Sequence, residues 1–204
     1  MANVVQHDLE TLEVDEAQVH EAVEAVVHTI LFNRALGEVE FEEKRLQKFP
    51  SLSYIRCDAD QVRAAVDDAL DNLDDRLELV GPDLVRGHVE VSFFEVRQRK
   101  GFLGLGGPTE ARVYWERWRL PVVVHKGSLQ AVAAEEGLRN IILSILQQAN
   151  SVAIVPRIKS DSSKYPVFPF EVSVSPISDG APKEGFFNQL LAKGPPVSMR
   201  FNIS

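Results

Sequence analysis

Residues 97–118 read RQRKGFLGLGGPTEARVYWERW, and this stretch decides how the middle of the chain folds. Both ends have strand-like composition, and the four glycines and the proline between them mark a turn or loop. The loop also carries Phe102, Leu103 and Leu105, and each large side chain is held in water at a cost of about 1.5–3 kcal/mol relative to burial. We therefore expect either a tip that another molecule covers or a loop that folds back onto its own core.

The apolar pattern changes phase on both sides of this loop. Residues 89–93 alternate apolar with polar, and the apolar phase then shifts by one at residues 94–96. After the loop a similar switch falls near residues 116–117. Such switches indicate a bulge, or a strand covered on both faces. Pro121 lacks an N–H donor, so we expect this strand to lie at an edge or to be bulged there.

Periodicity predicts three main helices. Asp15–Gln18 reads as a capping box that opens a helix to about Arg34, and Asp58–Gln61 opens a second helix that ends at Gly81-Pro82. The third helix, capped by Ser128, carries an apolar face at three- and four-residue steps. That face consists of Leu138, Ile141, Ile142, Ile145, Leu146 and Ala149.

The remaining segments predict strands. They lie near residues 9–14, 52–55, 170–174 and 197–203, and a short helix is expected over 184–192. Hairpins interleaved with helices favour an α+β fold with a largely antiparallel sheet. At 204 residues with 45% apolar content, we expect a single domain with one core.

Composition and charge argue against several classes of function. The formal charge of −8 and the absence of a Lys/Arg cluster disfavour binding to nucleic acid or anionic lipid. Cys57 is alone, the first ten residues lack a signal-peptide pattern, and the apolar runs are far shorter than the roughly 20 residues of a membrane span. We expect a soluble protein of a reducing, intracellular compartment, without a transmembrane segment.

Catalytic, cofactor and metal motifs are missing from the sequence. The glycine-rich loop lacks both G-x-G-x-x-G spacing and a following helix, and the five histidines contain no i, i+4 pair. We interpret the Asp pairs at 67/68 and 74/75 as a solvated helix face, and His28 as a histidine at the edge of the core. Cys57 has no evident base or cation beside it. We expect no enzyme activity, and a small nucleotide-binding enzyme ranks last among the alternatives.

Five segments together resemble the autophagy-related protein 101 family, over roughly residues 8 to 193 with gaps. The most specific are a helix motif that ends in His-Thr and two aliphatic residues, and a W-x-x-W strand. The segments are Leu12–Val14, Glu21–Leu31, Tyr54–Cys57, Val91–Val96 and Tyr114–Trp118.

The resemblance implies a HORMA domain, an α+β fold in which three helices back a sheet. It implies one domain over residues 1–204, with 152–204 as a C-terminal segment that wraps the sheet edge. It further implies a non-enzymatic subunit of the autophagy-initiation kinase complex that pairs with the HORMA domain of autophagy-related protein 13 and stabilises it. Such a subunit would be cytoplasmic and recruited to the site of autophagosome formation, without a cofactor or a metal.

Two features depart from the family pattern. Animal members carry a Trp-Pro-Phe tip in the hairpin loop that recruits downstream factors, whereas this chain has Gly101–Leu105 and no tryptophan. Phe102, Leu103 and Leu105 are then the candidate partner-binding residues, within a 101–107 loop. The tail Pro195–Ser204 has a strand pattern where we expect the family's chain to be ending in or just after a helix. The alternative is a peptide-closing HORMA protein of the chromosome axis or spindle checkpoint, with 152–204 as its mobile belt.

Overall fold

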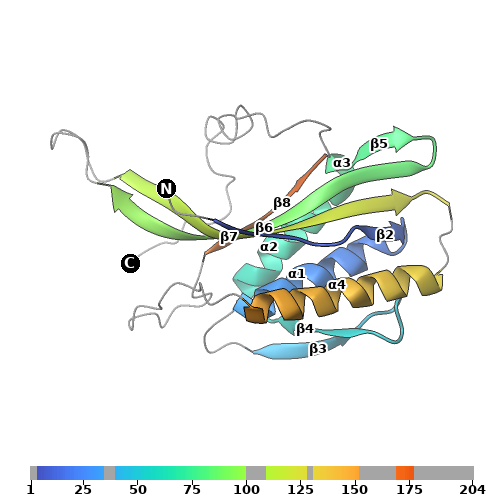
Figure 1. Ribbon diagram of the computed structural model, residues 1–204, viewed down its shortest axis with the longest axis horizontal. Coiled ribbons are helices and arrows are strands. Elements are labelled where there is room, and N and C mark those ends of the chain that lie inside the picture. Colours follow the sequence, from blue (N-terminus) through green and yellow to red (C-terminus); the bar gives the residue numbers. More distant parts are fainter. Residues whose placement is uncertain (1–3, 35–39, 100–108, 128–130, 152–168, 177–204) are drawn as a thin grey trace.

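The computed structural model describes residues 4–34, 40–99, 109–127, 131–151 and 169–176 of the 204-residue chain. Its main sheet is built on a long antiparallel hairpin of β6 and β7, and the strand order is β1-β7-β6-β5, with β2 also paired to β7 and β8 also paired to β6 (Figure 1). The strands of this sheet are β1 Val5–Asp8, β2 Leu12–Asp15, β5 Glu78–Gly81, β6 Leu84–Arg99, β7 Thr109–His125 and β8 Phe170–Ser175.

Four helices are described, and they lie on one side of the main sheet (Figure 1). They are α1 Val19–Arg34, α2 Asp60–Asp71, the single turn α3 Leu73–Arg76 and α4 Ala131–Ser151. The described residues therefore form a mixed fold with a mostly antiparallel sheet, which is compatible with the α+β expectation. No helix in this part of the chain has both the length and the apolar content to cross a bilayer.

Helix α1 is buried over most of its length, because it lies between the main sheet and a second, two-stranded sheet (Figure 1). The second sheet pairs β3 (Phe41–Arg45) with β4 (Ser53–Cys57). Every residue from Ala25 to Leu31 is buried, more than the single apolar face that periodicity predicts. The predicted capping interaction at its start is confirmed in part, since the Asp15 N–H donates to Gln18 Oε1 at 3.2 Å.

The second capping box was predicted wrongly. Helix α2 begins after Ala59, which acts as its N-cap without a side-chain hydrogen bond. The Asp58 carboxylate pairs instead with Arg63 at 3.2 Å and with Arg56 at 3.7 Å. The helical segment also ends earlier than predicted, at Arg76, because the chain turns there into β5.

The predicted phase switch is confirmed as a bulge between β6 and β7. Phe93 lies opposite Glu116, but the next residue, Phe94, lies opposite Tyr114, so that Trp115 is the additional residue. The predicted hairpin is also confirmed up to the pair Arg99↔Thr109.

Pro121 was predicted to lie at an edge or at a bulge, and both alternatives are wrong, because β7 is paired on both sides and Pro121 lies in regular register opposite His88. Strands β1 and β2 both pair with β7 in parallel, β1 opposite residues 116–119 and β2 opposite residues 122–125. Pro121 therefore lies in the gap between the two registers, where neither strand needs its missing N–H. The strand predicted near 9–14 corresponds to β2, whereas β1 and the parallel pairing of both strands with β7 were not predicted.

Several predictions fall on residues that the structure does not describe. These are the cap at Ser128, the short helix at 184–192, the terminal strand at 197–203 and the loop at 101–107. The strand predicted at 170–174 is confirmed as β8, which pairs antiparallel with β6.

Gly87 on β6 lies where two neighbouring segments approach the backbone closely. A Cβ atom at this position would collide with the Leu77 side chain and would lie 2.9 Å from the backbone oxygen of Ser175. We predict that Gly87→Ala lowers the free energy of unfolding by about 1–3 kcal/mol, because the Ser175 carbonyl is part of β8 and cannot move alone. Urea denaturation followed by circular dichroism measures the effect.

Gly137→Ala is the matched control. A Cβ atom at Gly137, within α4, meets nothing within 4 Å, so the same change should raise stability by about 0.5–1 kcal/mol through helix propensity. Equal effects at the two glycines would contradict the close approach at Gly87.

Candidate functional site

The β6–β7 hairpin extends beyond the rest of the main sheet. The pairing of β8 with β6 stops at Phe93, and the pairing of β1 with β7 starts at Glu116. Residues 94–99 and 109–114 thus pair only with each other among the described strands, and we call them the β6–β7 arm (Figure 1). The arm ends at residues 99 and 109, the two ends of the glycine-rich connection.

The predicted partner-binding residues Phe102, Leu103 and Leu105 belong to that connection. They lie outside the described residues, so their role stays a prediction. The structure describes the β6–β7 arm, whose two strands lead to these residues in the chain.

The base of the arm is held by the start of β8. The backbone N–H of Phe94 donates to the Pro169 oxygen at 3.0 Å. The Tyr114 hydroxyl donates to Glu171 Oε1 at 2.7 Å, and Arg112 donates to Oε2 of the same carboxylate at 2.8 Å. Burial and the neighbouring Glu171 carboxylate raise the pKa of Tyr114 to about 12, so this phenol remains a donor.

Aromatic contacts close the same region. The buried Phe94 ring lies 5.5 Å from the Tyr114 ring, centroid to centroid. The Arg112 guanidinium lies 4.7 Å from the centroid of the Phe94 ring, in a cation–π contact. The first residues of the arm are therefore packed and hydrogen-bonded.

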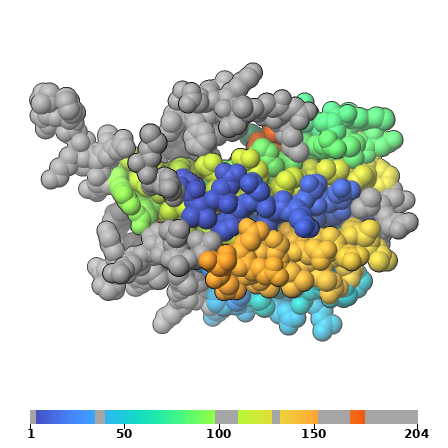
Figure 2. All heavy atoms as spheres, viewed as in Figure 1, coloured from blue at the N-terminus to red at the C-terminus, as the bar shows by residue number. Residues whose placement is uncertain are grey.

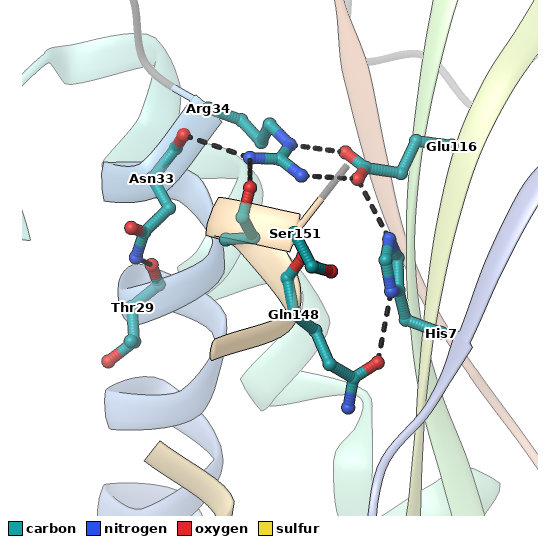
Figure 3. A network of polar contacts seen from close by, with 8 residues as sticks. His7, Thr29, Asn33, Arg34, Glu116, Gln148 and Ser151 are labelled. Atoms are coloured by element: carbon teal, nitrogen blue, oxygen red, sulfur yellow. Dashed lines mark hydrogen bonds and ion pairs between the residues drawn. The ribbon is translucent and has the colours of Figure 1, made fainter. Parts of the chain in front are cut away.

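The bulge places an ion pair in the interior, between the sheet and the helices (Figure 3). Arg34, the last residue of α1, is 4% exposed, and Glu116 on β7 is 1% exposed. Nε and Nη2 of Arg34 donate to the two carboxylate oxygens of Glu116, each at 2.6 Å. Nη1 of the same guanidinium donates to the Ala149 carbonyl at the end of α4, at 3.3 Å. The bidentate pair thus joins β7 to two helices.

His7 adds the N-terminal strand to this cluster. Its Nε2 donates to Glu116 Oε1 at 3.0 Å, and its Nδ1 lies 3.0 Å from Gln148 Oε1 on α4 (Figure 3). The imidazole also stacks on the Trp118 ring, with centroids 3.8 Å apart. We call His7, Arg34, Glu116 and Gln148 the Glu116 cluster.

Electrostatics within the cluster favour an ionised Glu116. Burial by itself raises the pKa of this carboxyl, but hydrogen bonds from Arg34 and His7 and the charge of Arg34 outweigh it, and the pKa falls below its ordinary value. Because both oxygens already accept hydrogen bonds, the carboxylate is a structural acceptor. The arrangement fixes the orientation of the arm relative to the helices.

Sequence reasoning located the phase switch near Glu116 but missed its partners. One signal was available, since Glu116 belongs to the same alternating set as the buried Trp118 and Leu120. A charged residue in a core-facing phase predicts a buried partner of opposite charge. Nothing in the local pattern singles out Arg34 or His7 as that partner.

The other polar residues considered as possible sites are either exposed on the surface or buried among other side chains. The Asp pairs at 67/68 and 74/75 are exposed, as predicted, and the described residues hold no group of three or more His, Cys, Asp or Glu side chains that could bind a metal ion. His28 is buried against the Tyr54 ring, with centroids 5.8 Å apart. Its burial lowers its pKa to about 4, so the imidazole is neutral.

Comparison with known proteins gives consistent matches. The family model described as Autophagy-related protein 101 matches residues 11–162. The chain is also similar to Autophagy-related protein 101 of Arabidopsis thaliana, with 24% identity over 215 residues that cover 92% of this chain and 95% of the relative. The range matched by the family model includes the whole arm and three members of the Glu116 cluster, whereas His7 precedes it.

We predict that Glu116→Gln lowers the free energy of unfolding by about 3–5 kcal/mol, because it leaves the Arg34 charge buried without its counter-ion. Urea denaturation at neutral pH measures this. Glu95→Gln removes a carboxylate from an exposed ion pair with Arg97 and should change stability by less than about 1 kcal/mol.

The same pair predicts an acid sensitivity. The pKa of the Glu116 carboxyl is lower in the folded state than its ordinary value of 4.5. Such a carboxyl stabilises the folded state at pH values above 4.5, and this stabilisation is lost as the pH falls from 4.5 through the pKa of the folded state. The natural chain should therefore lose more stability below pH 4.5 than Glu116→Gln does. Identical pH profiles for the two proteins would contradict an ionised Glu116.

Proposed function

Because the chain belongs to the autophagy-related protein 101 family, we propose that it is a non-catalytic adaptor subunit of the autophagy-initiation kinase complex. In this proposal the chain is one HORMA domain over residues 1–204, and residues 152–204 form the segment that wraps the sheet edge. It pairs with the HORMA domain of autophagy-related protein 13. It acts in the cytoplasm and is recruited to the site of autophagosome formation.

The observation that carries the adaptor role is the β6–β7 arm. The arm leaves the main sheet as a two-stranded ribbon whose base is fixed by Glu171, Tyr114 and the Glu116 cluster. A ribbon with a fixed base suits the presentation of a short apolar tip, because the strands that carry the tip need no further ordering when a partner binds. We assign the recruitment of downstream autophagy factors to Phe102, Leu103 and Leu105 at that tip.

The family assignment favours this function over that of a peptide-closing HORMA protein of the chromosome axis or spindle checkpoint.

Coexpression with the HORMA domain of autophagy-related protein 13 from the same organism tests the pairing. We predict a stoichiometric complex in size-exclusion chromatography and a higher yield of soluble chain than on expression alone, since binding to the folded state stabilises it. Separate elution of the two proteins at micromolar concentration would contradict the pairing.

The tip is tested by the double substitution Phe102→Asp/Leu103→Asp. We predict that the variant folds and still forms the heterodimer but recruits downstream factors at least about tenfold more weakly, as expected when apolar anchors are lost. Pull-down from cell extract, quantified against the natural chain, measures recruitment.

Val132→Asp is the control for this variant, because it places one aspartate on an 80% exposed valine of α4. If Phe102→Asp/Leu103→Asp loses solubility while Val132→Asp does not, the loop is part of the core and the assignment of the tip is wrong.

A further inference from the structure

Strand β5 is an edge strand of the main sheet and, like β8, pairs only with β6 among the described strands. It pairs with β6 along one edge, through Glu78↔Arg86 and Leu79↔Val85, and no described strand pairs with its other edge. An unpaired strand edge presents backbone donors and acceptors to any extended chain that reaches it. The strand stands at a corner of the molecule, shown at the upper right in Figures 1 and 2.

Two neighbouring apolar side chains are exposed on this edge. Leu79 is 58% exposed and Val80 is 50% exposed, and the register of β5 with β6 shifts between Leu79 and Gly81, so that Val80 lies at the irregularity. A single exposed valine is ordinary. Edge strands are commonly protected by short length, by a bulge or by charges, and β5 has four residues with one charged side chain, Glu78.

The segment of the chain that contains β5 is strongly acidic. Between residues 67 and 83 the chain has seven acidic residues and one arginine, which leaves −6 of a whole-chain charge of −8 in this segment. All seven acidic side chains are exposed. Among the ion pairs of the described residues, only Asp74 of this group takes part, with the exposed His20 at 3.1 Å. We call Asp67, Asp68, Asp71, Asp74, Asp75, Glu78 and Asp83 the acidic rim.

The acidic rim restricts what can occupy the edge. A second copy of the chain would bring two such rims together, and nucleic acid or anionic lipid would be repelled in the same way. A positively charged segment would be attracted. Strand addition to an edge takes its affinity from the backbone and its specificity from alternate side chains.

We propose that the outer edge of β5 is a docking site for an extended segment of a partner protein in which apolar residues alternate with Lys or Arg. The segment adds to β5 as a further strand, its apolar side chains cover Leu79 or Val80, and its basic side chains pair with the acidic rim. This site is separate from the β6–β7 arm and does not depend on the function proposed above.

A short blocked peptide in which Lys and Val alternate is the probe. It is titrated into the full-length, ¹⁵N-labelled chain and followed by amide chemical shifts. We expect saturable shifts at residues 78–81 and weaker binding as the ionic strength is raised. Shifts spread over the surface, or no saturation, would overturn the proposal.

Two variants test the edge itself. Leu79→Lys/Val80→Lys adds repelling charge and should weaken binding of the probe at least about tenfold. Leu79→Ser/Val80→Ser removes the apolar contacts without added charge and should also weaken it, which separates the apolar contribution from a charge effect. Val132→Lys, on the 80% exposed valine of α4, should bind the probe like the natural chain. Unchanged affinity in both β5 variants would overturn the proposal.

Two altered peptides test the mode of binding. A Glu–Val peptide should not bind, because its charge matches that of the acidic rim. A Lys–Val peptide with N-methyl groups on alternate amides keeps its charge but cannot pair along a strand edge, and it should lose binding. Equal binding of the N-methylated and the unmodified peptide would show a purely electrostatic contact and would refute strand addition.

Discussion

The bidentate pair between Arg34 and Glu116 is the interaction on which the arrangement of the other elements depends. Two opposite charges are held almost without contact with solvent, and each compensates the desolvation of the other. The partners come from the end of α1 and from the β7 bulge, and the same cluster engages α4 and β1. A shift of any of these four elements would leave a buried charge or a buried imidazole without a hydrogen-bond partner, so the cluster selects one relative placement among many that apolar packing alone would tolerate.

The bulge explains why this pair can exist. It inserts Trp115 into β7, which lets both Trp115 and Glu116 be buried while the strand continues to pair with β6. It also marks the point where the sheet narrows to the β6–β7 arm. The bulge thus determines both the position of the Glu116 cluster and the point where the β6–β7 arm begins. Bulges commonly redirect side chains near functional sites.

Patterns within one element were predictable from the sequence, and relations between distant elements were not. The buried face of α4, apart from the 37% exposed Leu146, and the phase switch at Phe93 and Phe94 follow from local periodicity. Strand β3 was missed because its run Phe41–Arg45 is mostly charged and exposed, and β5 because its four residues directly follow helical periodicity. The Glu116 cluster joins residues up to 141 positions apart, which no local pattern encodes. The family resemblance, carried by specific motifs, was confirmed.

The parallel pairing of the N-terminal strands has a consequence for the order of assembly on the ribosome. Residues 5–15 are made before β7, and their partners on that strand follow about 110 residues later. At a synthesis rate of about 5–20 residues per second, the first strands wait roughly 5 to 20 s before their template is available. Such non-local contacts form slowly, so sheet closure and the locking of His7 onto Glu116 are late events of biogenesis. The nascent chain exposes unpaired strand edges during this interval, when holding chaperones would have most to bind.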